Sequence, residues 1–190
     1  YTAARVIVDL VRQGRKVGIT ANSHAVISNL LAAVFEQAEN EGVATRAYQK
    51  YKASDEEEQR KPDGLTYTDD NDVVAGAIAS GECDIIAGTA WLFAREELVS
   101  AVDTLVVDEA GQLSLANVCA VAPAAENLVL VGDPRQLAQP SKGTHPVGAG
   151  ASALEHVLDG ATTVADHLGL FLDRTWRMHP EITEFISEQI

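Results

Sequence analysis

Short apolar segments that alternate with helical segments constrain the fold of this chain more than any other feature. The apolar segments are 16–20, 43–48, 83–87, 103–107, 127–131 and 168–172. Segments with apolar residues at helical spacing lie before, between and after them: 3–11, 24–40, 72–80, 115–125, 151–158 and 180–190. Strands of about five apolar residues joined by helices predict an α/β fold, in which helices cover both faces of a parallel sheet.

Two stretches interrupt this alternation. Residues 50–70 are charged, contain few aliphatic side chains and carry a Pro-Asp-Gly turn signal. We predict a surface insertion there, and its simplest form is a solvated, mobile loop. Residues 133–150 are rich in proline and glycine and predict a long loop.

Composition bounds the size of the domain and its partners. The chain has 190 residues, 46% of them hydrophobic, which predicts one domain with fragments of a second. Its formal net charge is −14, so the basic footprint of a whole nucleic-acid-binding domain is absent. A local groove can still be positive on an acidic protein, and nucleic acid therefore stays open as a partner.

Neither the cysteines nor the apolar runs indicate secretion or a membrane. Cys83 and Cys119 match no metal or redox spacing, and they predict buried thiols in a reducing, cytoplasmic setting. No apolar run approaches the roughly 20 residues that span a bilayer, so we expect no membrane partner. The chain opens in helical pattern without an initiator methionine, and we expect it to be an excerpt from a longer protein.

Small and polar residues follow the predicted strands at the point where each strand ends. Asn22 and Ser23 follow the strand at 16–20, and Thr89 follows the strand at 83–87. In open parallel sheets, ligands bind outside the carboxyl ends of the strands. This rim of the sheet is therefore the predicted functional site.

Asp108 and Glu109 stand side by side at the end of the apolar strand 103–107. One carboxylate could hold a hard cation and the other could orient and deprotonate an attacking water, which is the division of labour in phosphoryl transfer. The alternative is structural, because an Asp at a strand-to-helix junction often caps the helix. The pair by itself leaves both interpretations open.

Five motifs in order along the chain resemble those of superfamily 1 helicases. They are TANSHAVISNLL (20–31), AGTAWLFA (87–94), VDEAGQ (107–112), LVGDPRQLAQP (130–140) and LDRTWRMHPEI (172–182). The branch they resemble most is that of the nonsense-mediated-decay RNA helicase and the Dna2-like DNA helicase–nucleases. The resemblance implies a P-loop NTPase with a RecA-like parallel sheet, ATP and Mg²⁺ as cofactors, and single-stranded nucleic acid as partner.

The resemblance also implies roles in ATP hydrolysis. Asp108 would coordinate Mg²⁺, and Glu109 would be the catalytic base. Gln136 would contact the γ-phosphate or the attacking water, and Arg177 would be an arginine finger. The nucleotide-binding set would also include Gln112, Gly132 and Asp133. Two of these residues also have a purely structural interpretation. Gln136 could cap its loop, and Arg177 could form a surface ion pair that contributes little to stability.

On the same grounds, Asn22, Ser23, Thr89 and Trp91 would line the path of the single strand. Hydroxyl and amide groups can bind phosphates, and an aromatic side chain can stack on a base. Trp91 has an alternative, since a tryptophan in an apolar segment is as readily part of the core. His24 is more simply a hydrogen-bonding spacer than a ligand.

A nucleotide motor needs a phosphate-binding loop, normally G-x-x-x-x-G-K-[ST], and the sequence contains none. The resemblance places that loop upstream of Tyr1, so we expect the central phosphate-loop strand to be missing and two apolar strand edges to be exposed. The expected domains are a partial first RecA-like motor domain (1–172, with the insertion at 50–70) and the start of the second (173–190). We expect the isolated chain to be inactive.

Three functions stay open at this point. The leading one is an ATP-dependent helicase or translocase, with DNA slightly favoured over RNA as its strand. The others are an ATPase switch that moves no strand and a degenerate module that serves as a binding scaffold. Further partners that the resemblance implies are the second RecA-like domain and, as in bacterial relatives with a DNA-repair role, a fused RecB-like nuclease module.

Overall fold

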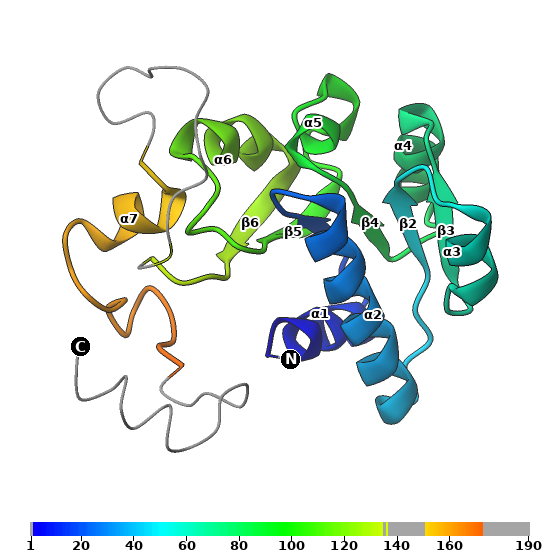
Figure 1. The fold of residues 1–190 in the computed structure, drawn as a ribbon, viewed down its shortest axis with the longest axis horizontal. Helices are drawn as coiled ribbons and strands as arrows, with labels where there is room; N and C mark the ends of the chain where they lie inside the picture. The colour runs from blue at the N-terminus through cyan, green and yellow to red at the C-terminus, as the bar shows by residue number, and fades with distance from the viewer. Residues whose placement is uncertain (1, 135, 137–150, 173–190) are drawn as a thin grey trace. The chain divides into compact units, whose positions relative to one another are not determined.

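A six-stranded parallel sheet forms the centre of the fold (Figure 1). The structure is a computed structural model, and it describes residues 2–134, 136 and 151–172. The strands are β1 (Val17–Thr20), β2 (Ala47–Lys50), β3 (Leu65–Thr68), β4 (Ile85–Ala87), β5 (Val102–Val107) and β6 (Ala125–Leu130). Their order is β3-β2-β4-β1-β5-β6, and every neighbouring pair is parallel. The predicted α/β fold with a parallel sheet is confirmed.

The helices end where the sequence provides stop signals. They are α1 (Thr2–Arg12), α2 (His24–Glu41), α3 (Asp55–Arg60), α4 (Asn71–Ser80), α5 (Ala90–Phe93), α6 (Leu115–Val121) and α7 (Ala153–Leu158), with 3-10 turns η1 (Glu96–Leu98) and η2 (Ala122–Ala124). Ser23 caps α2 by accepting a hydrogen bond from the Val26 amide. Gly42 and Gly81 close α2 and α4 in the left-handed conformation.

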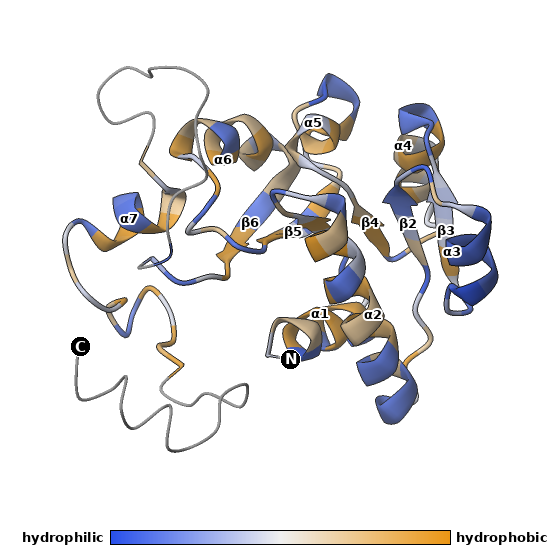
Figure 2. Ribbon diagram, viewed as in Figure 1, coloured by the Kyte–Doolittle hydropathy of each residue, from blue (hydrophilic) through white to orange (hydrophobic). Residues whose placement is uncertain are grey.

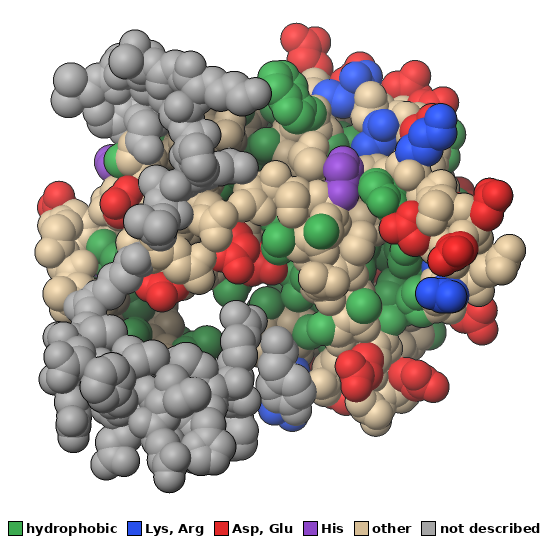
Figure 3. Space-filling view, in the orientation of Figure 1, with side chains coloured by type: hydrophobic (Ala, Val, Ile, Leu, Met, Phe, Trp, Pro, Cys, Tyr) green, Lys and Arg blue, Asp and Glu red, His purple; other side chains and the backbone are tan. Residues whose placement is uncertain are grey.

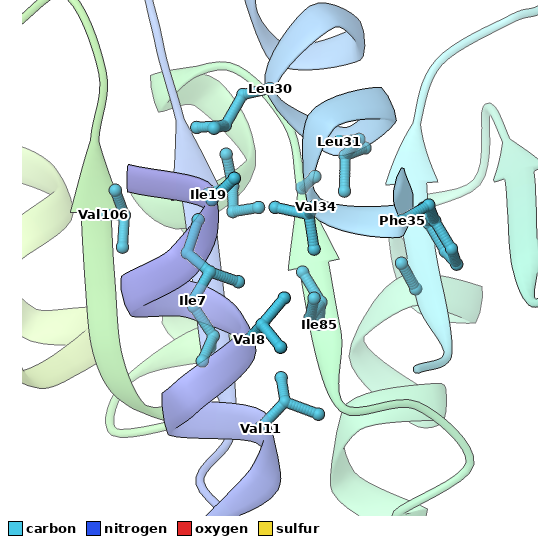
Figure 4. Close-up of a cluster of buried hydrophobic side chains, with 14 of the residues drawn as sticks. Ile7, Val8, Val11, Ile19, Leu30, Leu31, Val34, Phe35, Ile85 and Val106 are labelled. Carbon is cyan, nitrogen blue, oxygen red and sulfur yellow. The ribbon is translucent and has the colours of Figure 1, made fainter. Parts of the chain in front are cut away.

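Helices cover both faces of the sheet. Successive strand residues point to opposite faces, so each face has its own hydrophobic core. Ile85 packs in a core with α1 and α2, whereas its neighbour Ile86 packs in a second core with α4, α5 and α6. Figure 4 shows the first of these cores, where Ile7 and Val8 of α1 meet Val34 of α2 over the sheet. Figure 2 shows hydrophobic residues in the central strands β4 and β5 and hydrophilic residues in β2.

The solvated, mobile loop that is the simplest interpretation of residues 50–70 is wrong, whereas the surface insertion itself stays a prediction. The segment contains α3, which has no buried residue, and β3, which pairs with β2 in the register Ala47↔Leu65. Ser54 and Glu57 form a capping box that starts α3. The run of charges on this exposed helix hid the strand that follows, in which Leu65 is the buried residue.

Other boundaries also differ from the sequence prediction. The second strand begins at Ala47 rather than at residue 43, and the short helix α5 follows β4 directly. The predicted strand at 168–172 is wrong: these residues form no strand, and Leu170 is 88% exposed. The predicted helix at 180–190 and most of the predicted loop at 133–150 lie outside the described residues.

The sheet is continuous, so its strands leave no gap at the centre. The expected pair of apolar edges is therefore wrong for the described strands, because β1, β4 and β5 each hydrogen-bond to two neighbours. The outer strands are β3 and β6. Only β6 shows apolar exposure at its edge, where Leu128 is 39% exposed.

The structure divides into two compact units, Tyr1–His156 and Val157–Ile190. The sheet belongs to the first unit, and the predicted boundary between 172 and 173 stays a prediction. Cys83 is buried, and burial raises the pKa of its thiol to about 12, whereas Cys119 is exposed and not a buried thiol as predicted. Among the described residues, no helix combines the length and the apolar character that a membrane span requires.

Candidate functional site

The parallel sheet brings the predicted site residues to one edge, because all six strands end there. The positions that follow β1, β4, β5 and β6 at this edge include Asn22, Ser23, Thr89, Trp91, Asp108, Glu109, Gln112, Gly132, Asp133 and Gln136. Arg177 lies outside the described residues. The site can therefore be described from ten of the eleven predicted positions.

Asp108 and Glu109 form a tight turn directly after β5. The Asp108 amide donates to the Thr20 carbonyl (2.8 Å), which ties the turn to the end of β1. The Asp108 carboxylate accepts from the Glu109 amide (3.0 Å). Glu109 has a φ of 53°, in the left-handed region that non-glycine residues seldom adopt. A strained residue beside an acid is typical of a functional turn.

The helix-capping interpretation of Asp108 is wrong. Helix α6 begins at Leu115, and its cap is Ser114, whose hydroxyl accepts from the Asn117 amide (3.3 Å). Desolvation by burial raises the pKa of Asp108, and the hydrogen bond from the Glu109 amide only partly offsets this. A partly buried carboxylate that caps no helix is available for a ligand.

Gln112 connects three strand ends through its side-chain amide. Its carbonyl oxygen accepts from Asn22 Nδ2 (2.7 Å), after β1. Its nitrogen donates to Gln136 Oε1 (2.9 Å), after β6, and over a longer distance to Glu109 Oε2 (3.4 Å). The residues predicted to act on nucleotide are thus hydrogen-bonded to a residue predicted to contact the strand.

The turn after β5 and the loop after β6 pack backbone against backbone. The Ala110 amide donates to the Val131 carbonyl (2.9 Å). A Cβ on Gly111 would lie 2.2 Å from the Asp133 carbonyl oxygen, and one on Gly132 would lie 2.9 Å from the Ala110 nitrogen. Only glycine allows this approach. The sequence analysis missed the role of Gly111, although the two small residues after Glu109, Ala110 and Gly111, could have indicated a close backbone contact.

Three buried side-chain atoms without a hydrogen-bond partner lie in one short segment. They are Thr20 Oγ1, Asn22 Oδ1 and His24 Nδ1, and no other atom of this kind occurs in the part of the chain that the structure describes. A buried polar atom without a partner costs about 1–3 kcal/mol. Because all three atoms lie at or just after the end of β1, they leave hydrogen-bonding capacity at this rim that a bound ligand can satisfy.

Trp91 is not part of the core. It is 88% exposed on α5 and lies beside a groove of about 300 Å³ that Asn22, Thr89 and Asn117 also line. Thr89 starts α5 without a capping hydrogen bond, so its hydroxyl is available, whereas the Ser23 hydroxyl caps α2. Core packing is therefore the wrong interpretation of Trp91, and base stacking stays a prediction.

The acidic turn fits a cation that is held mainly by phosphates and water. Mg²⁺ typically takes one or two protein carboxylates and keeps several waters. Asp108 provides one carboxylate, whose Oδ2 binds no protein donor among the described residues. No three His, Cys, Asp or Glu side chains within these residues converge as a protein-only metal site would require.

These features define a class. A parallel sheet covered by helices on both faces, with an acidic turn after one strand and a glutamine loop after the next, is the α/β RecA-like fold of P-loop nucleotide hydrolases.

A family model described as AAA domain matches residues 28–139, and the chain belongs to this family. The family and the fold agree with an ATP-dependent, helicase-like domain in general terms.

Two solved structures show distant similarity. The C-terminal part of the Fun30 ATPase domain aligns with 99% of this chain and 51% of its own, at 10% identity and a TM-score of 0.45. The Sulfolobus solfataricus SWI2/SNF2 ATPase core in complex with dsDNA aligns with 70% of this chain and 31% of its own, at 15% identity and a TM-score of 0.32. This chain spans about half the length of the first structure, and neither likeness is strong enough to indicate function. No curated protein matches the chain.

Proposed function

We propose that the chain carries part of the first RecA-like motor domain, and the start of the second, of an ATP-dependent translocase or helicase that moves on single-stranded nucleic acid, with DNA slightly favoured over RNA. The observation that supports this proposal most is the Gln112 amide. It hydrogen-bonds to Asn22 at 2.7 Å and to Gln136 at 2.9 Å, and it reaches Glu109 at 3.4 Å. A motor needs such a link between its nucleotide and its strand.

In this proposal the acidic turn acts on the terminal phosphate of ATP. Asp108 would hold Mg²⁺, whose charge restores the ionised carboxylate that burial disfavours. The cation supplies charge neutralisation for phosphoryl transfer when it is bound. Glu109 would take the proton of the attacking water, because its turn projects it beside Asp108 at the strand end. Arg177 would come from the second motor domain.

Gln136 would report the state of the nucleotide to the strand. It lies in the loop after β6, and its carbonyl oxygen accepts from Gln112. Asn22 stands on the other side of Gln112 and lines the groove beside Trp91. Movement of Gln136 on loss of the γ-phosphate would therefore pull or release an amide that also holds Asn22.

ATP turnover by the natural polypeptide that contains this chain tests the proposal. We expect hydrolysis to need Mg²⁺ and to rise when a single-stranded oligonucleotide is added. Turnover that no oligonucleotide changes would favour a switch that moves no strand, and failure to bind ATP would favour a scaffold. The 190-residue chain alone is expected to be inactive, because its sequence contains no phosphate-binding loop. Metal-dependent turnover by the chain alone would contradict this expectation.

A further inference from the structure

A second groove lies at the ends of β2 and β4 on the same rim, beside the groove described above. Its volume is about 370 Å³, and its lining includes His24, Lys50, Tyr51, Lys52, Thr89 and Trp91. Lys50 is the last residue of β2, and Tyr51 and Lys52 follow it. We call this groove the lysine groove. It shares Thr89 and Trp91 with the groove beside Asn22, so the two grooves meet at the Trp91 side chain.

The two lysines of this groove are electrostatically unusual for the chain. Most other Lys and Arg side chains among the described residues form an ion pair or donate a hydrogen bond. The side chains of Lys50 and Lys52 form no hydrogen bond or ion pair within the described part of the chain, although the charge of Lys50 acts on the nearby His24 ring. In a chain with a formal net charge of −14, two neighbouring uncompensated cations indicate an anionic ligand.

Figure 3 shows Lys and Arg side chains gathered in one region of the visible face, near a histidine, with acidic side chains around them. Asp69 is the acidic residue in the lining of the lysine groove, and it forms no ion pair with either lysine. A second carboxylate, that of Glu57, accepts a hydrogen bond from the Tyr51 hydroxyl at the border of the groove (3.0 Å), and it forms no ion pair with Lys50 or Lys52 either.

Aromatic rings give the groove flat surfaces as well as charge. The rings of His24 and Tyr51 lie 5.1 Å apart at 37°, and Tyr51 meets Tyr67 edge to face at 5.8 Å. His24 Nδ1 is buried without a partner, which leaves a polar atom for a ligand to satisfy. Trp91, with most of its ring in solvent, is available for stacking.

We propose that the lysine groove binds the sugar–phosphate backbone of the single strand, with Lys50 and Lys52 on successive phosphates and Trp91 stacked on a base. This inference rests on the proposed function and extends the strand path from the end of β4 to the end of β2. Positive charge beside a stacking platform is the combination that binds single strands without sequence preference.

Oligonucleotide binding by the 190-residue chain tests the proposal. Fluorescence anisotropy with a labelled oligo-dT is measured from 50 to 200 mM salt. The test variant is Lys50→Glu with Lys52→Glu, and the milder Lys50→Gln with Lys52→Gln serves if charge reversal disturbs folding. The matched control is Arg60→Glu with Lys61→Glu, which makes the same change in net charge at α3 and its cap, outside the groove.

We expect the slope of log K against log salt to fall by about 1.4 in the test variant, because each phosphate contact on a single strand contributes about 0.7. The control should keep the wild-type slope. Trp91→Ala should weaken binding about 5- to 150-fold, the range that loss of one stacked base produces.

Two results would overturn the inference in different ways. If the chain binds oligo-dT and both charge-reversal variants lose the same affinity and slope, the lysine groove is not the site, while the proposed function stands. If the wild-type chain does not bind oligo-dT at 50 mM salt, the inference fails, whereas the proposed function is decided separately by the ATP turnover of the natural polypeptide. Displacement of oligo-dT by poly-glutamate at equal charge would show that the groove takes acidic polypeptide instead.

Discussion

Replacing Gly111 by alanine should damage both the stability of the domain and the geometry of its rim. The new Cβ would lie 2.2 Å from the Asp133 carbonyl oxygen, which belongs to the backbone of the opposite loop. Ordinary carbon–oxygen contacts are about 3.3 Å, so the two loops must separate by roughly 1 Å. No side-chain rotation can relieve a contact with a carbonyl group.

The cost follows from the packing around this contact. Inserting a methyl group into a packed interior costs about 1–3 kcal/mol. In a domain of this size, 1 kcal/mol corresponds to about 2–4 °C in Tm, so Gly111→Ala should lower Tm by about 2–12 °C. Thermal unfolding followed by circular dichroism measures the change.

Gly76→Ala is the matched control, because it adds the same methyl group in open space. Gly76 lies inside α4 and a Cβ there meets nothing within 4 Å. Alanine is favoured over glycine in a helix by about 1 kcal/mol, so this variant should raise Tm by about 2–4 °C. A Gly111→Ala protein as stable as the wild type would refute the close approach of the two loops.

Three further predictions concern single side chains. In the natural polypeptide, Glu109→Gln should lower ATP turnover about 10²–10⁴-fold and leave ATP binding intact, whereas the control Glu126→Gln on β6 should change neither turnover nor ATP binding. Undiminished hydrolysis by the Glu109→Gln variant would exclude Glu109 as the base. Gln112→Ala removes the hydrogen bonds of Gln112 to Asn22 and Gln136. We expect ATP turnover stimulated by the oligonucleotide to fall more than basal turnover. An equal fall of both would disprove that Gln112 couples the nucleotide to the strand. Burial, and then the charge of Lys50, lowers the pKa of His24, so the unfolded chain takes up the proton first and stability should fall as the pH drops below about 6.5. The Tm of the His24→Gln variant should therefore decrease less than that of the wild type between pH 7.5 and 5.5. Equal decreases would show that His24 does not contribute to the pH dependence of stability.

The sequence predicted the central strands well because they are buried on both faces. A strand such as β5 is a continuous apolar run, and its hydrophobic pattern persists whatever surrounds it. It predicted β3 badly, because that edge strand has one fully buried residue and follows an exposed, highly charged helix. The apolar segment at 168–172 shows the reverse error: an apolar run becomes a strand only where a neighbouring strand offers hydrogen bonds.

The sequence by itself determined which chemistry could be present. Adjacent carboxylates after an apolar strand, a glutamine loop after the next strand and the order of five motifs required no coordinates. What only the tertiary structure decided is how these groups meet. Strand order places the ends of β1, β5 and β6 side by side, so that Gln112 reaches both Asn22 and Gln136. Exposure also had to come from the structure, because whether Trp91 or Lys50 faces solvent depends on residues that are distant in sequence and packed around them only after folding.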